Sequence, residues 1–152
     1  MEPRPVSCGA VVKTVEQSTP ERILVVDDEQ SLRVVIEQYL RRLGHNVVAC
    51  RNGREAWETF ESDPLSFTLV LADITLPEMS GAELLARMLN LNPRTCILIC
   101  SGYPFDMATL PQAYQRQTGF LQKPFTPRML AASIGRLLAD RDAASPRQHP
   151  PA

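Results

Sequence analysis

The sequence is poor in the features that mark membrane-embedded, secreted or nucleic-acid-binding proteins. Its 152 residues contain no run of about eighteen apolar residues, so no transmembrane helix is predicted. Residues 1–20 lack the continuous apolar stretch of a signal peptide. The formal net charge is −1, which provides no cationic field for nucleic acid or an anionic bilayer. We therefore expect a cytoplasmic protein that binds neither nucleic acid nor membrane directly.

Cysteine and histidine are too scarce and too scattered to form a zinc site. There are four cysteines, none in a CxxC pair, and only two histidines. Cys96 and Cys100 lie on one face of an apolar strand pattern, where free cysteine packs as a small hydrophobe. No G-x-G-x-x-G follows the first predicted strand, which argues against a Rossmann dinucleotide site.

Five short apolar runs alternate with helical patterns between residues 21 and 140. The predicted strands are Arg22–Val26, His45–Ala49, Phe67–Ala72, Thr95–Cys100 and Gly119–Gln122. This alternation predicts an α/β domain, a doubly wound parallel sheet with helices on both faces. Pro104 and Pro111 interrupt the segment 104–117, so we expect a short, poorly anchored helix there. Residues 1–20 are predicted to be a flexible leader and residues 141–152 a disordered tail.

Four of the predicted strands end on residues that carry chemistry. Asp27 and Asp28 follow the first strand, Asp73 the third, Ser101 the fourth and Lys123 the fifth. The carboxyl ends of parallel strands lie at one edge of a sheet, where ligands of such folds bind. These side chains are therefore expected to converge although they are far apart in the sequence.

A cluster of three carboxylates needs a compensating cation. Two charges 4 Å apart repel by about 4 kcal/mol at an effective dielectric constant of 20. One lysine cannot balance three acids, whereas Mg²⁺ prefers one or two carboxylates together with water and phosphate oxygens. A cation, an ammonium group and a hydroxyl around one free carboxylate suit phosphoryl transfer, with Asp73 as the nucleophile.

The motifs around these residues resemble the receiver domain of bacterial two-component response regulators. The matching segments are VVDD at the first strand end, ADITLPEMSG at the third, SG at the fourth and KPF at the fifth. The resemblance spans residues 21–140 and implies a flavodoxin-like (CheY-like) sheet of order 2-1-3-4-5. It also implies a Mg²⁺-dependent phosphorelay protein that catalyses only its own phosphorylation and dephosphorylation and is not otherwise an enzyme.

The same resemblance implies a role for each residue of the acidic site. Asp73 matches the phospho-accepting aspartate, and Lys123 the invariant lysine. Asp28 matches the acid that binds Mg²⁺ directly, and Asp27 the acid that binds it directly or through water. The backbone carbonyl of Thr75 matches the third protein ligand of the metal.

Two further residues match the switch of the family. Ser101 stands where threonine is commoner and keeps the hydroxyl, while Phe120 replaces the commoner tyrosine. The implied phosphoryl donor is a histidine kinase or a histidine phosphotransfer protein. The implied output is a protein contact through the face of segment 104–117, strand 119–122 and the last helix, with Pro111 unusual there. The bond between Lys123 and Pro124 is expected to be cis.

Two other functional contexts stay open at this stage. Receivers also form the C-terminal part of hybrid sensor histidine kinases, which the segment FLQKPFTPRML resembles, although Met1 and the short tail favour a free-standing protein. An aspartyl-phosphate hydrolase of the haloacid-dehalogenase type is the less favoured alternative. Such enzymes place a second acid two residues after the nucleophile, where this chain has Thr75.

Overall fold

The structure, a computed structural model, describes residues 21–144. Its strands are Arg22–Val26 (β1), Asn46–Cys50 (β2), Leu69–Asp73 (β3), Cys96–Ser101 (β4) and Thr118–Gln122 (β5). Its α-helices are Gln30–Arg42 (α2), Gly53–Ser62 (α3), Gly81–Leu91 (α4), Gln112–Gln115 (α5) and Pro127–Ala144 (α6). Two short 3-10 helices are Pro64–Ser66 (η2) and Met107–Thr109 (η3). The predicted leader, residues 1–20, lies outside the described residues.

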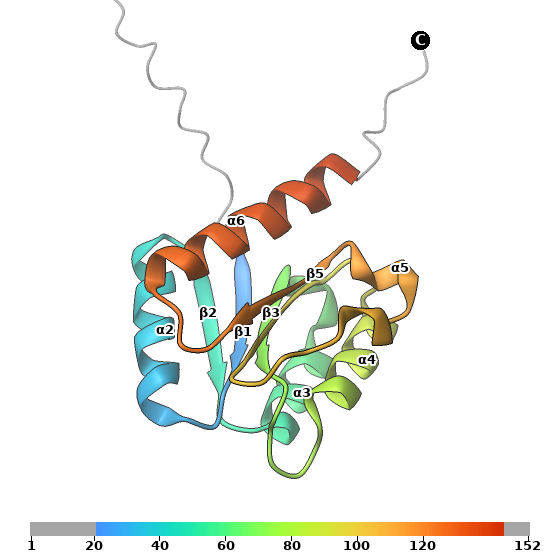
Figure 1. Ribbon diagram of the computed structural model, residues 1–152. Helices are drawn as coiled ribbons and strands as arrows, with labels where there is room; N and C mark the ends of the chain where they lie inside the picture. Colours follow the sequence, from blue (N-terminus) through green and yellow to red (C-terminus); the bar gives the residue numbers. More distant parts are fainter. Residues whose placement is uncertain (1–20, 145–152) are drawn as a thin grey trace, which may run out of the picture.

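The five strands form one parallel sheet of order β2-β1-β3-β4-β5, which confirms the predicted fold class (Figure 1). Each strand lies within one or two residues of its predicted position. The largest difference is at β3, which begins at Leu69 rather than Phe67. The Phe67 ring is buried and stacks on Phe60 at 5.7 Å between centroids, so it packs against α3 before the strand starts.

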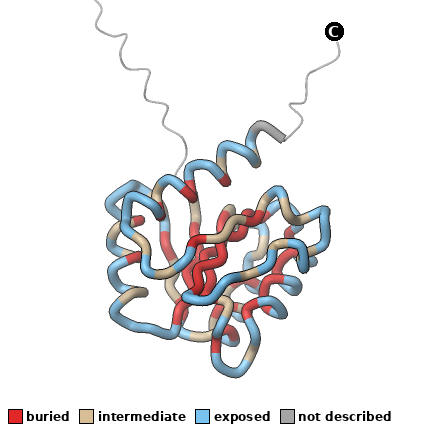
Figure 2. Tube along the Cα trace, viewed as in Figure 1, coloured by how far each residue is buried: buried red, intermediate tan, exposed pale blue. Residues whose placement is uncertain are grey.

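The sheet is buried on both faces because its central strands are apolar except at one end of each, where Arg22, Asp73 and Ser101 stand. Successive side chains of β1 point to opposite sides and enter two separate core clusters. On one face the helical residues of the core are Ile36 and Leu40 of α2 with Leu130, Ile134 and Leu137 of α6. On the other face they are Ala56 and Phe60 of α3 with Leu84, Leu85, Met88 and Leu89 of α4. Figure 2 shows this burial concentrated along the central strands.

The segment 104–117 is helical only in part, as its two prolines predict. It contains η3 and the four-residue helix α5, and neither has a buried residue. Pro111 is the residue immediately before α5, and its carbonyl accepts the Tyr114 N–H at 2.9 Å. A proline cannot donate a backbone hydrogen bond, so a helix cannot continue unbroken through this position.

The last helix begins as its sequence predicts and ends later than expected. Thr126 caps it by accepting the Met129 N–H at 3.1 Å, and Pro127 occupies its first position. The Lys123–Pro124 bond that precedes it is cis. Residues 141–144, placed in the tail by the sequence, continue α6, and Arg141 lies 3.9 Å from Glu21. The rest of that tail, residues 145–152, lies outside the described part of the chain.

The carboxyl ends of all five strands lie at one edge of the sheet, at the lower side of Figure 1. The loop between β3 and α4 bulges from this edge, and the turns after β1, β4 and β5 approach it. Of the helices within residues 21–144, none has the length and apolar character needed to cross a bilayer.

Candidate active site

Three aspartates meet at the carboxyl edge of the sheet. Asp27 and Asp28 directly follow β1, and Asp73 is the last residue of β3. Carboxylate oxygens of the three residues lie within 4.8 Å of one another. Asp27 and Asp73 are buried, whereas Asp28 is exposed and gives the cluster a solvent-facing side. The structure thus brings together the acids that the strand ends predicted.

Lys123, which follows β5, joins the two buried acids. Its ammonium group donates to Oδ2 of Asp73 at 2.8 Å and to Oδ2 of Asp27 at 3.0 Å. Burial lowers the pKa of Lys123, but the hydrogen bonds and charges of the two carboxylates outweigh burial and raise this pKa above its usual value. The lysine therefore stays charged. Three carboxylates and one ammonium group leave a formal charge of −2 (−3 + 1), which suits a divalent cation.

The other oxygen of Asp73 is held by a single neighbouring residue. Thr75 donates to Oδ1 of Asp73 twice, through its backbone N–H at 2.8 Å and its hydroxyl at 2.9 Å. Burial raises the pKa of Asp73, but the hydrogen bonds from Lys123 and Thr75 outweigh it, and the pKa lies below its usual value. Asp73 is thus a carboxylate at neutral pH, which is the form a nucleophile requires.

In Asp27, the effect of burial on the pKa is larger than the combined effect of its hydrogen bonds. Its Oδ1 accepts the Glu29 N–H at 2.9 Å, and its backbone carbonyl accepts the guanidinium of Arg33 at 2.7 Å. Burial raises its pKa more than the hydrogen bonds from Glu29 and Lys123 lower it. A cation nearby would favour its charged form, so the residue is suited to a ligand position.

The predicted switch residues lie on the two strands beyond β3, Ser101 at the end of β4 and Phe120 in β5. Ser101 is fully buried at the end of β4, and its hydroxyl accepts the Tyr103 N–H at 3.1 Å. Its carbonyl accepts the Lys123 N–H at 2.8 Å, which ties β4 to the lysine. Within residues 21–144, no hydrogen bond joins Ser101 to Asp73. Phe120 is half-buried and packs against the core cluster beneath α3 and α4.

The loop after Asp73 depends on a glycine at its far end. The Gly81 N–H donates to the Ile74 carbonyl at 3.1 Å and closes the loop. A Cβ atom at Gly81 would lie 2.6 Å from Ile74 Cα and 2.8 Å from the Asp73 carbonyl, so only glycine permits this approach. At the tip of the loop, Glu78 has a φ of 71°, in the left-handed region.

Three contacts of the site were not predicted from the sequence: the Thr75 hydroxyl on Asp73, the Tyr103 N–H on Ser101, and Arg33 on the Asp27 carbonyl. The contact of Tyr103 has a local signal that could have revealed it, because Asp, Asn, Ser and Thr side chains often accept from the backbone two residues on. The hydroxyl of Thr75 bonds a side chain and has no such signal. The contact of Arg33 had no such signal, because it depends on the rotamer of a long side chain.

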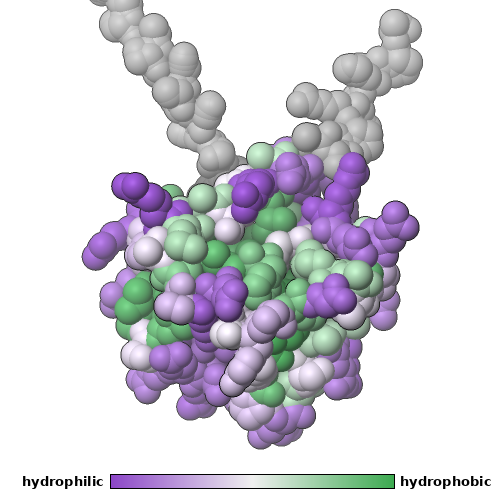
Figure 3. Space-filling view, viewed as in Figure 1, coloured by the Kyte–Doolittle hydropathy of each residue, from purple (hydrophilic) through white to green (hydrophobic). Residues whose placement is uncertain are grey.

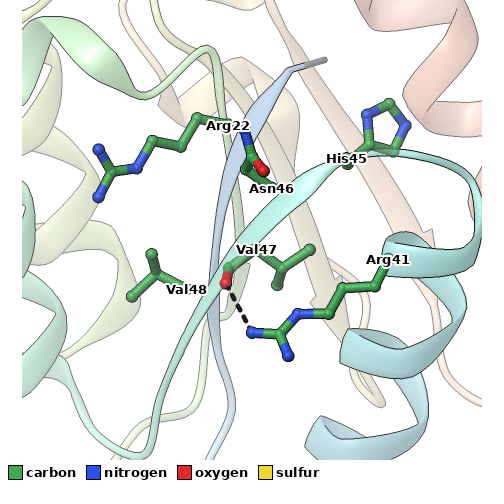
Figure 4. Close-up of a pocket in the computed structure, with 6 residues that line it drawn as sticks. All are labelled: Arg22, Arg41, His45, Asn46, Val47 and Val48. Atoms are coloured by element: carbon green, nitrogen blue, oxygen red, sulfur yellow. Dashed lines mark hydrogen bonds between the residues drawn. The ribbon is translucent and has the colours of Figure 1, made fainter.

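A separate hollow lies at the opposite edge of the sheet, beside the start of β1 and β2 (Figure 4). This cavity of about 500 Å³ is lined by Arg22, Arg41, His45, Asn46, Val47 and Val48. Its guanidinium groups already have partners. Arg41 donates to the Val47 carbonyl at 3.1 Å and pairs with Glu37 at 2.8 Å, while Arg22 lies over the Phe67 ring.

Comparison with known proteins agrees with the fold. The family model described as "Response regulator receiver domain" matches residues 23–135. The response regulator receiver protein CpdR of Brucella abortus is 31% identical over 118 residues, covering 78% of this chain and 97% of CpdR. The sensor kinase CckA of the same organism is 30% identical over 132 residues, covering 87% of this chain. This chain spans only 14% of the length of CckA.

Solved structures show the same relationship. A CheY-like receiver domain protein from Methanospirillum hungatei superimposes with a TM-score of 0.74 at 28% identity, covering 84% of this chain and all of that one. The receiver domain of the hybrid histidine kinase CckA gives a TM-score of 0.66 at 27% identity, covering 77% of this chain and 98% of that one. With the family model, the CpdR match and this shared architecture, the chain belongs to the response regulator receiver family.

Proposed function

We propose that the protein is a phosphoreceiver in which Asp73 accepts a phosphoryl group from the phosphohistidine of a histidine kinase or a histidine phosphotransfer protein. The observation that carries this proposal is the environment of Asp73. It is a buried, ionised carboxylate that holds a lysine on one oxygen and lies within 4.8 Å of two further carboxylates. Membership of the receiver family supports a phosphohistidine protein as the phosphoryl donor. It also supports a cytoplasmic location for the protein.

The acceptance step follows from these positions. A carboxylate oxygen of Asp73 forms a bond to phosphorus while the P–N bond of the donor breaks, and the imidazole keeps the electron pair and takes up a proton. The ammonium group of Lys123 already contacts Asp73. It is therefore placed to stabilise the negative charge that develops on the phosphoryl oxygens. In a separate hydrolysis step, water attacks phosphorus, the bond to Asp73 breaks with its electron pair returning to the carboxylate, and the protons of the water leave with the phosphate. The protein catalyses this cycle only on itself.

The acidic cluster fits Mg²⁺ as the cofactor of this step. Asp27, Asp28 and Asp73 would supply carboxylate oxygens, and the backbone carbonyl of Thr75 is the proposed further ligand. When bound, Mg²⁺ would neutralise charge on the phosphoryl oxygens. Without it, the residues retain a formal charge of −2, which would repel an incoming phosphoryl group.

The output is proposed to be a protein contact on the face of α5, β5 and α6. Figure 3 shows apolar side chains gathered in the middle of this view, over β5. Tyr103 and Met129 belong to the exposed apolar residues, and Phe120 is half-buried. Withdrawal of the Ser101 hydroxyl from Tyr103 toward a phosphoryl group would free the loop beside this face, so phosphorylation would shift its conformational equilibrium.

A second context for the same function is a receiver joined to a sensor kinase. The kinases CckA of Brucella abortus and LuxN of Vibrio harveyi match this chain at 30% and 32% identity over 14% of their length. CpdR, matched over 97% of its length, supports the free-standing arrangement. The gene sequence upstream of Met1 distinguishes the two.

The proposal is tested by labelling with acetyl phosphate, a small phosphoryl donor. We expect the wild type to gain one phosphoryl group in Mg²⁺ and none in EDTA, as measured by intact-protein mass. Asp73→Asn should abolish the gain, whereas Asp140→Asn, an exposed acid of α6, should leave it unchanged. Equal labelling of wild type and Asp73→Asn would refute the assignment.

A further inference from the structure

β2 is the outermost strand on one side of the sheet that residues 21–144 form. On its inner side, the Asn46 N–H donates to the Glu21 carbonyl at 2.9 Å, directly before β1. Successive residues of a strand direct their backbone groups to opposite sides, so the N–H and C=O groups of Val47 and Ala49 point away from β1. Two residues of β2 therefore present donors and acceptors to the outer edge of the sheet.

The cavity of about 500 Å³ lies along this edge. It is bordered by the first three residues of β2, and the side chains of Arg22 and Arg41 lie on opposite sides of the strand (Figure 4). The outward carbonyl of Val47 accepts the guanidinium of Arg41 at 3.1 Å. A carbonyl oxygen has two acceptor positions, so this bond leaves one for a strand partner. An open strand edge with space beside it is suited to the addition of another strand.

We propose that residues 10–15 of this same chain, AVVKTV, add to the outer edge of β2 as a sixth strand. Four of these six residues are β-branched, which favours an extended backbone. No proline stands between Pro5 and Pro20, so every residue of the segment can donate a backbone hydrogen bond. Lys13 in the middle suits an outermost strand, because a charged side chain there discourages further pairing. The sequence pattern predicts a flexible leader for residues 1–20, and the open edge of β2 gives part of that leader a partner.

The length of the connection fixes the direction of the added strand. Residues 16–21 join the segment to Arg22, where β1 begins beside the start of β2. The segment must therefore approach that end of the sheet with its carboxyl terminus, antiparallel to β2. The connection has to pass β2, a distance of two strand spacings or about 10 Å. Six residues can span about 20 Å, and an antiparallel outer strand is common on parallel sheets.

The charges at the start of β2 agree with this direction. Glu16 follows the segment directly, and the antiparallel order places it beside Arg22 and Arg41. The side chains of these two arginines are 39% and 58% exposed, so they can reach a further acceptor. Each guanidinium has five donors, and an added carboxylate does not require the loss of an existing partner.

A second copy of the chain is the alternative occupant, through pairing of two β2 edges. The segment of the same chain is favoured because a six-residue connection holds it at an effective concentration on the order of millimolar. This inference goes beyond the proposed function, since it concerns the outer edge of β2 and no step at Asp73. Labelling of Asp73 and the state of this edge are therefore tested separately.

The experiment measures amide hydrogen exchange by NMR in the full chain at two protein concentrations. The wild type is compared with a double variant, Val11→Pro with Val12→Pro. Successive N–H groups of a strand point to opposite sides, so one of these prolines removes a hydrogen bond to β2 whatever the register. Val6→Pro with Ser7→Pro is the matched control outside the segment. The Ile97 amide, which donates to the Gln117 carbonyl at 2.9 Å, reports on the rest of the sheet.

We expect the Val47 and Ala49 amides to exchange about ten-fold more slowly in the wild type and the control than in the variant at positions 11 and 12. Exchange at Ile97 should be the same in all three proteins. In the wild type, nuclear Overhauser contacts should join residues 10–15 to Val47 and Ala49, and their absence would overturn the inference. Equal exchange in the three proteins would also overturn it. Protection that grows with protein concentration would assign the edge to a second copy and overturn it as well.

Discussion

The ammonium of Lys123 lies 2.8 Å from Oδ2 of Asp73, although fifty positions separate the two residues. The same group lies 3.0 Å from Asp27, so one side chain joins the carboxyl ends of β1, β3 and β5. Its own pKa is raised by these two carboxylates against the effect of burial. Lys123 is therefore the electrostatic partner of Asp73 and also stabilises the carboxyl edge of the sheet, because it links three strand ends.

Replacing Lys123 should destabilise the metal-free protein. Lys123→Met keeps most of the stem but leaves two buried carboxylates without their cation, which should lower the free energy of unfolding by about 3 kcal/mol. Mg²⁺ should restore part of this loss, because it supplies a new cation to the same acids. Urea denaturation with EDTA and with Mg²⁺ measures both effects, and Arg136→Met on the exposed side of α6 is the control. A Lys123→Met protein as stable as the wild type in EDTA would show that the ion pairs of Lys123 with Asp27 and Asp73 do not stabilise the fold.

The stability of the metal-free protein should depend on pH through Asp27. Burial raises the pKa of this carboxyl above 3.8, so its charged form is less favourable in the folded chain than in the unfolded one. Its stabilising contribution is therefore complete at low pH and is lost as pH rises through the raised value. Asp73 has a lowered pKa and acts in the opposite direction, because its contribution is lost as pH falls.

Asp27→Asn separates these two effects. Asparagine carries no charge at any pH, so the variant should gain stability relative to the wild type as pH rises from about 3 to about 7. Urea denaturation in EDTA at several pH values measures this gain, and Asp140→Asn should follow the wild type throughout. If the asparagine variant became less stable than the wild type at neutral pH, the stabilisation that Lys123 gives the Asp27 carboxylate would exceed the cost of burying that carboxylate.

The loop after Asp73 should not tolerate a side chain at Gly81. Gly81→Ala places a methyl group 2.6 Å from Ile74 Cα, so the backbone must move, at a cost of about 3 kcal/mol. Phosphoryl acceptance should fall as well, because the moved atoms adjoin Asp73. Gly135→Ala is the matched control, because a Cβ atom at this position would have nothing within 4 Å. Alanine in this helix should raise the free energy of unfolding by up to about 1 kcal/mol. Similar unfolding curves for the two variants would contradict the packing argument.

Ser101 should be needed for the response to phosphorylation more than for acceptance. Ser101→Ala removes the acceptor of the Tyr103 N–H and the hydroxyl that would turn toward the phosphoryl group. We expect continued labelling at Asp73 but much smaller amide chemical-shift changes in β5 and α6 on addition of beryllofluoride, a phosphoryl mimic. Ser101→Thr keeps the hydroxyl and should retain the response. An unaltered response in the alanine variant would exclude Ser101 as the switch.

The fold and the acidic cluster could be predicted from the sequence because both depend on local patterns. Apolar runs located the strands, and the parallel topology then brought Asp27, Asp73 and Lys123 to one edge. The start of β3 could not be predicted, because Phe67 has strand character yet stacks on Phe60.

Other features depended on side-chain geometry or long-range packing, which the sequence pattern does not contain. The Arg33 contact with the Asp27 carbonyl rests on one rotamer. The extra turn of α6 coincides with a contact between Arg141 and Glu21, at the two ends of the described chain. The contact of the Thr75 hydroxyl with Asp73 likewise depends on the side-chain rotamer of Thr75.

The most direct measurement is to identify the phosphorylated residue itself. The wild type is treated with acetyl phosphate in Mg²⁺, the acyl phosphate is reduced with borohydride, and peptides are sequenced by mass spectrometry. We expect reduction at Asp73 alone, with Asp27 and Asp28 unmodified, and no reduced residue when EDTA replaces Mg²⁺. Modification of any other residue, or its absence from Asp73 under phosphorylating conditions, would contradict the central claim.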